Sequence, residues 1–398
     1  MLKRILSMLL ILLLSFSCFG VYSSADTDLI DTDGEGEGSL PTVSAPDLGI
    51  DAKSVILMEP VTGTILYEMN AEEALPPASV TKVMTLLLVW EALDSGVMHL
   101  QDKVTVSAYA ASMGGSQVFL EEGEEMTVED LVKCTVIASA NDAAVALAEH
   151  LMGTESAFVE KMNIRAGELG MQTAHFENVT GLDDDTVNHV LSAKDIAIAT
   201  RELSKHKGVF DYASLWMDTI RDGAFTLTNT NRLIRFYDGA TGLKTGSTEK
   251  AKFCISATAT RDGMDLIAVI MGAPSRDARN NAAKALFNWG FSTYTLYHDP
   301  SVTCENVPVS GGTADSVATR SQAFTAVVPK ADLSKMERTV SMQPGVSAPV
   351  KAGDTVGTVT YTLNGEVCGT APIFASQTVE EITFWSFLVK LIKIFTLS

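Results

Sequence analysis

The stretch PPASVTKVMTLLLVWEAL (Pro76–Leu93) is the most informative part of the sequence, because two prolines end the preceding segment and a long apolar run follows them. This pattern predicts a helix that starts at Ser79 and extends to about Leu93. The stretch also contains an S-x-x-K motif, formed by Ser79 and Lys82. Residues three apart share a face of a helix, so we expect the Lys82 amine within reach of the Ser79 hydroxyl.

The S-x-x-K motif by itself permits two interpretations. In one, Ser79 only caps the helix and Lys82 is a solvated surface residue. In the other, Ser79 is a nucleophile and Lys82 its base, with a pKa lowered from about 10.4 by burial or a nearby cation. The pattern recurs at Ser204–Lys207 and Ser247–Lys250, but Ser79 follows two prolines and opens an apolar helix, whose dipole favours developing negative charge.

Two further motifs follow along the chain. Ser139-Ala140-Asn141 is either a helix interruption or a second hydroxyl and an amide placed beside the nucleophile. Lys244-Thr245-Gly246 is either a charged turn or a cation beside a glycine-bared strand edge, which suits a peptide ending in a carboxylate. The three motifs together occur in the order that is the signature of class A β-lactamases and penicillin-binding proteins.

The residues around these motifs resemble the low-molecular-mass D-alanyl-D-alanine carboxypeptidases over roughly Asp47–His298. The matching stretches are Pro77–Lys82, Ala138–Asp142, Asn178–Leu182, His189, Ser192–Asp195 and Gly239–Gly246. The resemblance implies an α+β fold of the penicillin-binding/β-lactamase type, with an antiparallel sheet, helices on both sides and a helical subdomain. It implies removal of the terminal D-Ala from peptidoglycan pentapeptide stems through a serine acyl-enzyme that β-lactams inhibit.

The resemblance also assigns catalytic roles. Ser79 would be the acylated nucleophile and Lys82 its general base, and Ser139 would pass a proton toward the leaving amine. The backbone N–H groups of Ser79 and Ser247 would form the oxyanion hole. His189 invites a Ser-His-Asp interpretation, but the chain has no G-x-S-x-G elbow, so we expect a structural histidine.

The substrate-binding residues implied by the resemblance are Asn141, Lys244, Thr245, Gly246 and Ser247. Asn141 would hold the site together, and Lys244 with Thr245 would bind the terminal carboxylate of the peptide. The chain departs from the family pattern after the third motif. Relatives commonly have Ala-Gly there, whereas this chain has Ala251-Lys252, and we expect Lys252 on the strand to alter the local field or substrate entry.

Three other functions remain open from the sequence. A β-lactamase needs a water-activating glutamate, and the candidates Glu168 and Glu177 lack the E-x-x-x-N context. A D,D-endopeptidase would use the same residues on cross-linked peptides. An inactive wall-binding relative is disfavoured by the intact motif residues.

The remaining elements favour an α+β domain over residues 47–298 and a small all-β domain over residues 299–377. In the first, strands are expected at both sequence ends and helices between and after them. The expected elements are strands Ser54–Met58, Thr64–Glu68, Phe253–Thr260 and Leu266–Met271, and helices Val128–Leu151 and Ala278–Trp289. Turn signals such as Asn364-Gly365 divide the second domain.

Both ends of the chain carry targeting features. Residues 1–25 have a basic start, an apolar core too short to span a membrane and small residues near Ala25, which predicts a secretory signal peptide and an exported protein. Residues 26–46 are acidic and rich in small residues, which predicts a flexible linker. Residues 378–398 have a polar stripe on an apolar helix, which predicts an amphipathic anchor on the outer face of the bacterial cytoplasmic membrane.

Composition excludes some partners. The net charge of −20 argues against nucleic acid, whose phosphates attract basic surfaces. The cysteines expected to remain after export are widely spaced, and two of them, Cys134 and Cys254, lie in apolar runs, so we expect no disulfide framework. The histidines show no ligand spacing with these cysteines or with each other, so neither a metal nor another cofactor is expected.

Overall fold

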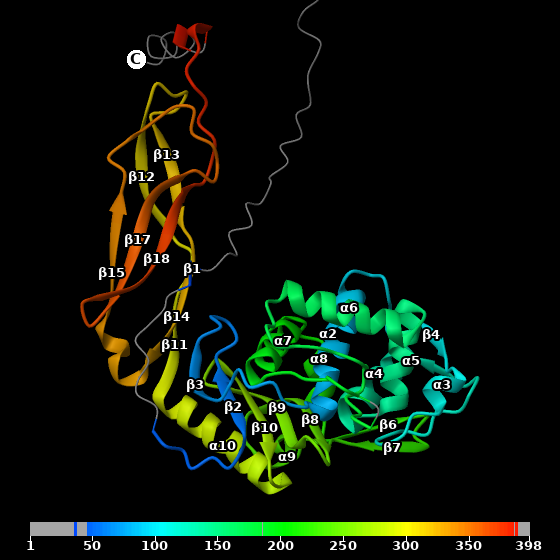
Figure 1. Ribbon diagram of the computed structural model, residues 1–398. Coiled ribbons are helices and arrows are strands. Elements are labelled where there is room, and N and C mark those ends of the chain that lie inside the picture. The colour runs from blue at the N-terminus through cyan, green and yellow to red at the C-terminus, as the bar shows by residue number, and fades with distance from the viewer. Residues whose placement is uncertain (1–35, 38–45, 185, 386, 389–398) are drawn as a thin grey trace, which may run out of the picture.

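The computed structural model describes residues 36–37, 46–184, 186–385 and 387–388. The expected signal peptide, residues 1–25, lies outside this part of the chain. Two domains follow one another, an α+β domain and an all-β domain, as the sequence predicts (Figure 1).

A five-stranded antiparallel sheet in the order β3-β2-β10-β9-β8 forms the centre of the first domain. Side chains alternate along each strand, so Ile267, Val269 and Met271 of β10 pack with the helical region while Leu266 and Ile270 pack toward α10. The strands are β2 (Ser54–Met58), β3 (Ile65–Met69), β8 (Ala240–Thr248), β9 (Lys252–Arg261) and β10 (Met264–Ala273).

Helices cover both faces of this sheet, as expected. The apolar face of α10 (Arg276–Thr293) packs on one side, and α7 (Ala193–Lys205) packs on the other with α2 (Lys82–Asp94) behind it. The remaining elements of this domain are β4 (Lys103–Thr105), α3 (Ala108–Ala111), β5 (Glu125–Thr127), α4 (Val128–Lys133), α5 (Asn141–Met152), α6 (Glu155–Glu168), α8 (Val209–Ala213), β6 (Met217–Ile220), β7 (Phe225–Thr228) and α9 (Leu233–Phe236).

Two helix predictions differ from the structure at the motif residues. The expectation of one helix over Val128–Leu151 is wrong, because a π-helical turn, Cys134–Ala138, follows α4 and Ser139 then takes a left-handed conformation with φ +63°. Ser and Asn side chains compete with the helical backbone, which explains the break. Ser79 lies in a 3-10 turn, Ala78–Thr81, that precedes α2 and is not part of the α-helix itself.

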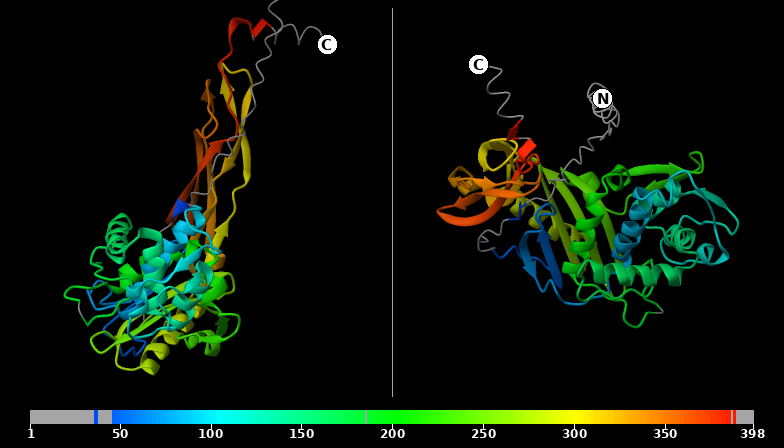
Figure 2. Two further views of the ribbon diagram at one scale, coloured as in Figure 1. Left: turned by 90° about the vertical axis from the view of Figure 1, so that its right-hand side faces the viewer. Right: turned by 90° about the horizontal axis from the view of Figure 1, so that it is seen from above.

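The second domain is elongated and stands on the first beside α10 (Figures 1 and 2). Its strands form a six-stranded sheet in the order β15-β17-β18-β13-β12-β16 and a three-stranded sheet in the order β1-β14-β11. Because β11 pairs with β14, strand pairing begins this domain at Tyr294, ahead of the expected boundary at residue 299. The elements are β1 (Gly36–Glu37), β11 (Tyr294–Asp299), β12 (Thr303–Ser310), β13 (Ser316–Ser321), β14 (Phe324–Pro329), a 3-10 helix (Lys330–Lys335), β15 (Met336–Met342), β16 (Val346–Ser347), β17 (Thr355–Leu363) and β18 (Glu366–Ala375).

The two predicted terminal segments are described only in part. Within the expected linker, Gly36–Glu37 form β1, which pairs in parallel with β14. Of the expected anchor, the structure describes residues 378–385 and 387–388, with helical geometry at Phe384, Trp385, Phe387 and Leu388, at the tip farthest from the first domain (Figure 2). None of the helices in the described ranges is both long and apolar enough to cross a membrane.

Candidate active site

Ser79 and Lys82 meet at the junction of the 3-10 turn and α2. The Lys82 Nζ lies 3.1 Å from the Ser79 Oγ, 2.6 Å from the Asn141 Oδ1 and 2.8 Å from the Thr180 carbonyl oxygen. A neutral amine has two hydrogens and one lone pair. Two carbonyl-type acceptors can take the two hydrogens, which leaves the lone pair for the hydroxyl of Ser79.

The Lys82 side chain is fully buried, and its environment favours the neutral amine. Burial lowers the pKa of Lys82 well below its ordinary value, and the nearby Lys244 cation lowers it further, while Asp142 opposes both effects. A neutral Lys82 is able to accept the proton of the Ser79 hydroxyl, as a general base must.

The second motif reaches the site through the break after the π-helical turn. The left-handed Ser139 directs its hydroxyl to Lys244, whose Nζ donates to the Ser139 Oγ at 2.7 Å. The Asn141 amide donates to the Gly114 carbonyl at 2.7 Å while its oxygen accepts from Lys82. A Cβ on Gly115 would lie 2.8 Å from the Asn141 Nδ2, so this loop can approach Asn141 closely only because residue 115 is glycine.

The third motif lies on β8, alongside the 3-10 turn. Lys244 is buried and donates to both Ser139 and the Thr245 carbonyl oxygen, at 2.7 and 3.0 Å. Burial, aided by the Arg279 cation, lowers the pKa of Lys244 to about 7. A Cβ on Gly246 would lie 2.8 Å from the Ser79 backbone nitrogen, so β8 runs against the amide end of the turn that carries Ser79.

A second glycine, Gly181, also fixes the Ala78–Thr81 turn. Gly181 has φ +81°, and a Cβ there would lie 1.8 Å from the Ala78 carbonyl oxygen. The neighbouring Thr180 supplies the carbonyl that accepts from Lys82. The Asn178–Leu182 loop therefore does two things: Thr180 binds the Lys82 amine, and Gly181 packs against the turn that carries Ser79.

A cavity of about 370 Å³ opens at Ser79. Ser79, Ser139, Thr245, Gly246 and Ser247 line it, whereas Lys82, Asn141 and Lys244 lie behind its wall. Sequence reasoning missed the other lining residues, which belong to no motif and reach the cavity only through the fold. They are Ser116, Trp216, Thr228, Asn229, Thr230, Arg232, Arg276 and Arg279.

The missed residues make the cavity cationic at one end. Thr245, which lines the cavity, donates its hydroxyl hydrogen to the Thr230 Oγ1 at 2.8 Å. Arg279 is buried and its pKa is lowered to about 10, mainly by burial, so it remains a cation at neutral pH. Together with exposed Arg232 and Arg276, it offers a carboxylate more positive charge than Lys244 alone.

His189 supports the site from behind. Its Nδ1 accepts from the Glu177 backbone N–H at 3.0 Å, so its Nε2 carries the hydrogen and donates to the Thr81 Oγ1 at 2.8 Å. Burial lowers the pKa of His189 to about 4, which keeps the ring neutral. His189 therefore supports the Ala78–Thr81 turn through Thr81, in line with the expected structural role.

Several other sequence candidates lie away from the cavity. Lys252 is exposed at the β8–β9 turn with φ +59°, a conformation that glycine adopts without strain, so the expected influence on the site is not supported by its position. The Ser204 hydroxyl donates to the Thr200 carbonyl within α7. Glu168 pairs with Arg165, and Glu177 accepts from two backbone N–H groups of its own loop.

Comparisons with known proteins agree with this geometry. A family model described as D-alanyl-D-alanine carboxypeptidase matches residues 41–275, and one described as penicillin-binding protein 5, C-terminal domain, matches residues 291–381. The carboxypeptidase DacF of Bacillus subtilis is 41% identical over 86% of this chain and 89% of its own length. The carboxypeptidase DacC of Escherichia coli is 33% identical over 87% and 90%.

Solved structures give the same result. Penicillin-binding protein 5 from Haemophilus influenzae superposes with a TM-score of 0.76 at 30% identity, covering 85% of this chain and all of that one. Penicillin-binding protein D2 from Listeria monocytogenes, solved in an ampicillin-bound form, has a TM-score of 0.55 at 33% identity over 62% of this chain and all of its own. The chain belongs to the D-alanyl-D-alanine carboxypeptidase family.

Proposed function

We propose that this protein is a serine-type D-alanyl-D-alanine carboxypeptidase that removes the terminal D-Ala from peptidoglycan pentapeptide stems. One observation supports the proposal most strongly. The Nζ of buried Lys82, whose pKa is lowered, lies 3.1 Å from the Ser79 Oγ, and its other hydrogen bonds go to two carbonyl-type oxygens. That arrangement activates a serine without a histidine.

In the first half-reaction, the Ser79 Oγ attacks the carbonyl carbon of the penultimate D-Ala and Lys82 accepts the hydroxyl proton. The oxyanion forms where β8 passes the 3-10 turn, within reach of the backbone N–H groups of Ser79 and Ser247. Ser139, held by Lys244, then relays the proton taken up by Lys82 to the amine of the departing D-Ala, so that Lys82 becomes neutral again. The carbon–nitrogen bond breaks and an ester with Ser79 remains.

The free carboxylate of the substrate selects the bond that is cut. Thr245 lines the cavity beside Arg276 and Arg279, and Lys244 lies directly behind, so the terminal carboxylate would bind at this end. In the second half-reaction a water replaces the departed D-Ala, gives a proton to Lys82 and attacks the ester carbonyl. The ester bond to Ser79 breaks as Lys82 returns this proton to the Ser79 Oγ, which restores the serine and the neutral lysine.

The same site would be acylated by β-lactams, whose carboxylate and strained carbonyl match those of the D-Ala-D-Ala terminus. Of the two glutamates considered for a β-lactamase, neither lines the cavity. A D,D-endopeptidase acting on cross-linked stems is the second candidate, because it would use the same residues, and exposed Arg232 and half-buried Trp216 line the cavity as further contacts for a larger leaving group.

The proposed location is the outer face of the cytoplasmic membrane, with the C-terminal segment lying on the lipid surface. Phe384 and Trp385 are each 73% exposed at the tip of the second domain, and such aromatic residues favour the lipid–water boundary. Protein truncated after Thr378 should no longer sediment with vesicles of anionic lipid. Unchanged sedimentation would exclude this segment as the anchor.

The proposed activity is tested by incubating the purified protein with a pentapeptide that ends in D-Ala-D-Ala and following the products by mass spectrometry. We expect loss of one alanine. A parallel reaction uses a cross-linked dimer of two stem peptides as substrate. This reaction distinguishes a carboxypeptidase from an endopeptidase. If the dimer is cleaved and the pentapeptide is not, the protein is an endopeptidase.

A further inference from the structure

A second cavity, of about 420 Å³, adjoins the cavity at Ser79. Arg232 lines both cavities, so the two meet at this side chain. One wall of the second cavity comes from α9 and the residue before it, and the other comes from α10; both helices lie at the lower edge of the first domain in Figure 1. We call this space the α9–α10 cavity.

One face of α10 leads from the Ser79 cavity into the α9–α10 cavity. Arg276, Asn280 and Lys284 are spaced four residues apart, so they share this face of the helix. Arg276 lines the Ser79 cavity, whereas Asn280 and Lys284 line the α9–α10 cavity. Eight residues of helix cover about 12 Å. The face therefore forms a polar path that starts where the terminal carboxylate of the substrate would bind.

Cations outnumber carboxylates along this path. Arg232, Arg276 and Lys284 make no ion pair with any residue in the described part of the chain. Asp277 is the carboxylate that lines the α9–α10 cavity, and it has no ion pair among the described residues either. Burial, together with the nearby Arg276 cation, lowers the pKa of Arg279 to about 10. Positive charge therefore remains in excess after one substrate carboxylate is bound.

Aromatic rings hold Arg232 in place without neutralising its charge. The Arg232 guanidinium lies 5.4 Å from the centroid of the Phe236 ring. Arg235 lies over the same ring at 5.8 Å and over Trp216 at 5.4 Å, and Trp216 itself lines the Ser79 cavity. A cation–π contact fixes the guanidinium but leaves its N–H groups able to donate to an anion. Arg232 is therefore already positioned for a negatively charged ligand.

A departing D-Ala would use only the first part of the path. Its one carboxylate would bind beside Thr245, close to Arg276 and Arg279. Its side chain is a methyl group, which has no charge to offer Arg232 or Lys284. Guanidinium groups bind carboxylates through paired N–H donors. The cations beyond the first carboxylate therefore favour a leaving group that carries a second one.

We propose that the α9–α10 cavity is a subsite for a second carboxylate on the leaving group, bound by Arg232 and Lys284. This inference rests on the proposed function and names the leaving groups that the enzyme prefers. They are a dicarboxylic D-amino acid at the end of the stem, or the acceptor stem of a cross-linked peptide with a free carboxylate near the cleaved bond. The bond that breaks and the proton transfers are those described above, and only the departing amine differs.

The test measures kcat/KM for two pentapeptides that differ only in the last residue, which is D-Glu or its neutral isostere D-Gln. We expect the D-Glu peptide to be preferred by about tenfold, the effect of about one charge-assisted hydrogen bond. In Arg232→Gln the ratio of the two peptides should fall to about one, whereas Arg232→Lys should retain part of the preference. Both peptides meet the same protein, so a general loss of activity in a variant cancels from the ratio.

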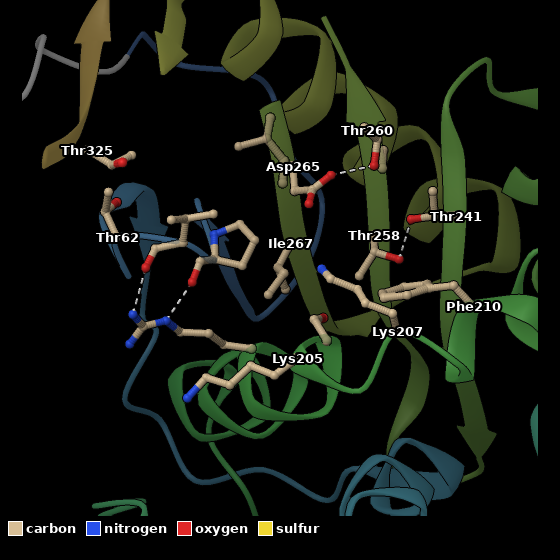
Figure 3. A pocket seen from close by; sticks show the side chains of 16 residues that line it. Thr62, Lys205, Lys207, Phe210, Thr241, Thr258, Thr260, Asp265, Ile267 and Thr325 are labelled. Atoms are coloured by element: carbon tan, nitrogen blue, oxygen red, sulfur yellow. Dashed lines mark hydrogen bonds between the residues drawn. The ribbon is translucent and has the colours of Figure 1, made fainter. Parts of the chain in front are cut away.

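The matched control is a cation in the groove shown in Figure 3, which shares no described lining residue with either cavity. Lys207 lines that groove, so Lys207→Gln should keep the original preference for D-Glu. Equal rates for the D-Glu and D-Gln peptides would overturn the inference. So would a preference that survives in Arg232→Gln, or one that is lost in Lys207→Gln.

A third pentapeptide, ending in D-Ala-D-Ala, separates this inference from the proposed function. Release of D-Ala without any preference for D-Glu would refute the subsite and leave the carboxypeptidase activity standing. No release of D-Ala would refute the proposed function and the inference with it. Cross-linked dimers with the acceptor carboxylate free or amidated identify the source of the second carboxylate. A preference for the free form that Arg232→Gln removes assigns the subsite to acceptor stems, whereas equal rates for the two dimers, beside a preference for D-Glu, assign it to terminal residues.

Discussion

The two domains differ in what they bury. In the first, the described interior contains Glu59, Lys82, Asp142, Lys244 and Arg279 among its charged side chains. In residues 299–377 the buried polar side chains are three hydroxyl residues, Thr319, Ser321 and Thr325, and the core is otherwise apolar. The described core of the second domain therefore contains no buried charged side chain, whereas the first retains charges that oppose folding.

This difference separates residues that stabilise the fold from residues that serve chemistry. The rings of Phe324 and Tyr361 stack with centroids 3.9 Å apart in the second domain, and the Tyr361 hydroxyl donates to the Asp299 Oδ2, so both contacts serve the fold. A buried lysine without a bonded carboxylate is costly unless it becomes neutral. In the mechanism that we propose for the first domain, a neutral Lys82 is the base beside Ser79.

The largest expected effect is on catalysis in the first domain. Ser79→Ala should lower D-Ala release by about 10⁴-fold or more, because the covalent route is lost. Ser204→Ala, the serine of another S-x-x-K pattern, is the matched control and should leave the rate unchanged. If Ser204→Ala were inactive and Ser79→Ala active, Ser204 would be the nucleophile. The buried charges around Ser79 would then not serve catalysis, and the contrast between the two domains would fail.

The next effect compares a glycine in each domain. Gly181→Ala should lower the free energy of unfolding by about 3 kcal/mol or more, because its Cβ meets the Ala78 carbonyl at a left-handed position. Gly365 has a similar φ of +85° but open space, so Gly365→Ala should cost only about 1 kcal/mol. Denaturant unfolding measures the free energy of unfolding of both variants. Equal losses would show that the close approach of Gly181 to Ala78 is not the reason that glycine is needed there.

The third effect is a pH dependence of stability. The pKa of Lys244 is about 7 in the folded state and about 10.4 when unfolded, so above pH 7 the unfolded chain binds one more proton. Stability relative to a Lys244→Met variant should then rise with pH, by about 1.4 kcal/mol per unit between pH 7 and 9. Parallel pH curves for the two proteins would mean that Lys244 stays charged.

The smallest effect concerns the departure from the family pattern. Lys252→Gly should stabilise the protein by about 0.5 to 1 kcal/mol, because glycine adopts the positive φ without strain. Its activity should be unchanged, since the side chain is exposed at the turn. Lys252→Ala keeps the strain while removing the charge, and a loss of activity in both variants would return Lys252 to the site.

The sequence alone predicts that Ser79 and Lys82 lie together, because this depends only on their spacing along the chain. Ser79 and Lys82 are three residues apart, and no tertiary information is needed to bring them together. The β2 strand and the turn at Asn364–Gly365 followed from local patterns in the same way.

The rest depended on contacts between distant residues. Arg276 and Arg279 begin a helix without any motif and reach the cavity only because α10 packs beside β9. The break at Ser139 could not be predicted, because the apolar run around it is typical of a continuous helix. The Ser139 hydroxyl points into the site because it accepts a hydrogen bond from Lys244, a residue far away in the sequence. The position of Lys252 likewise depends on a backbone angle that its side chain does not indicate.

The central claim is that Ser79, activated by Lys82, forms an acyl-enzyme that lacks a dedicated route for releasing a β-lactam. Its most direct test is mass spectrometry of the intact protein after brief exposure to penicillin, with digestion to locate the adduct. We predict one long-lived adduct on the peptide containing Ser79, absent from Ser79→Ala. Turnover of many equivalents of penicillin per second without any accumulated adduct would contradict the account and establish a β-lactamase.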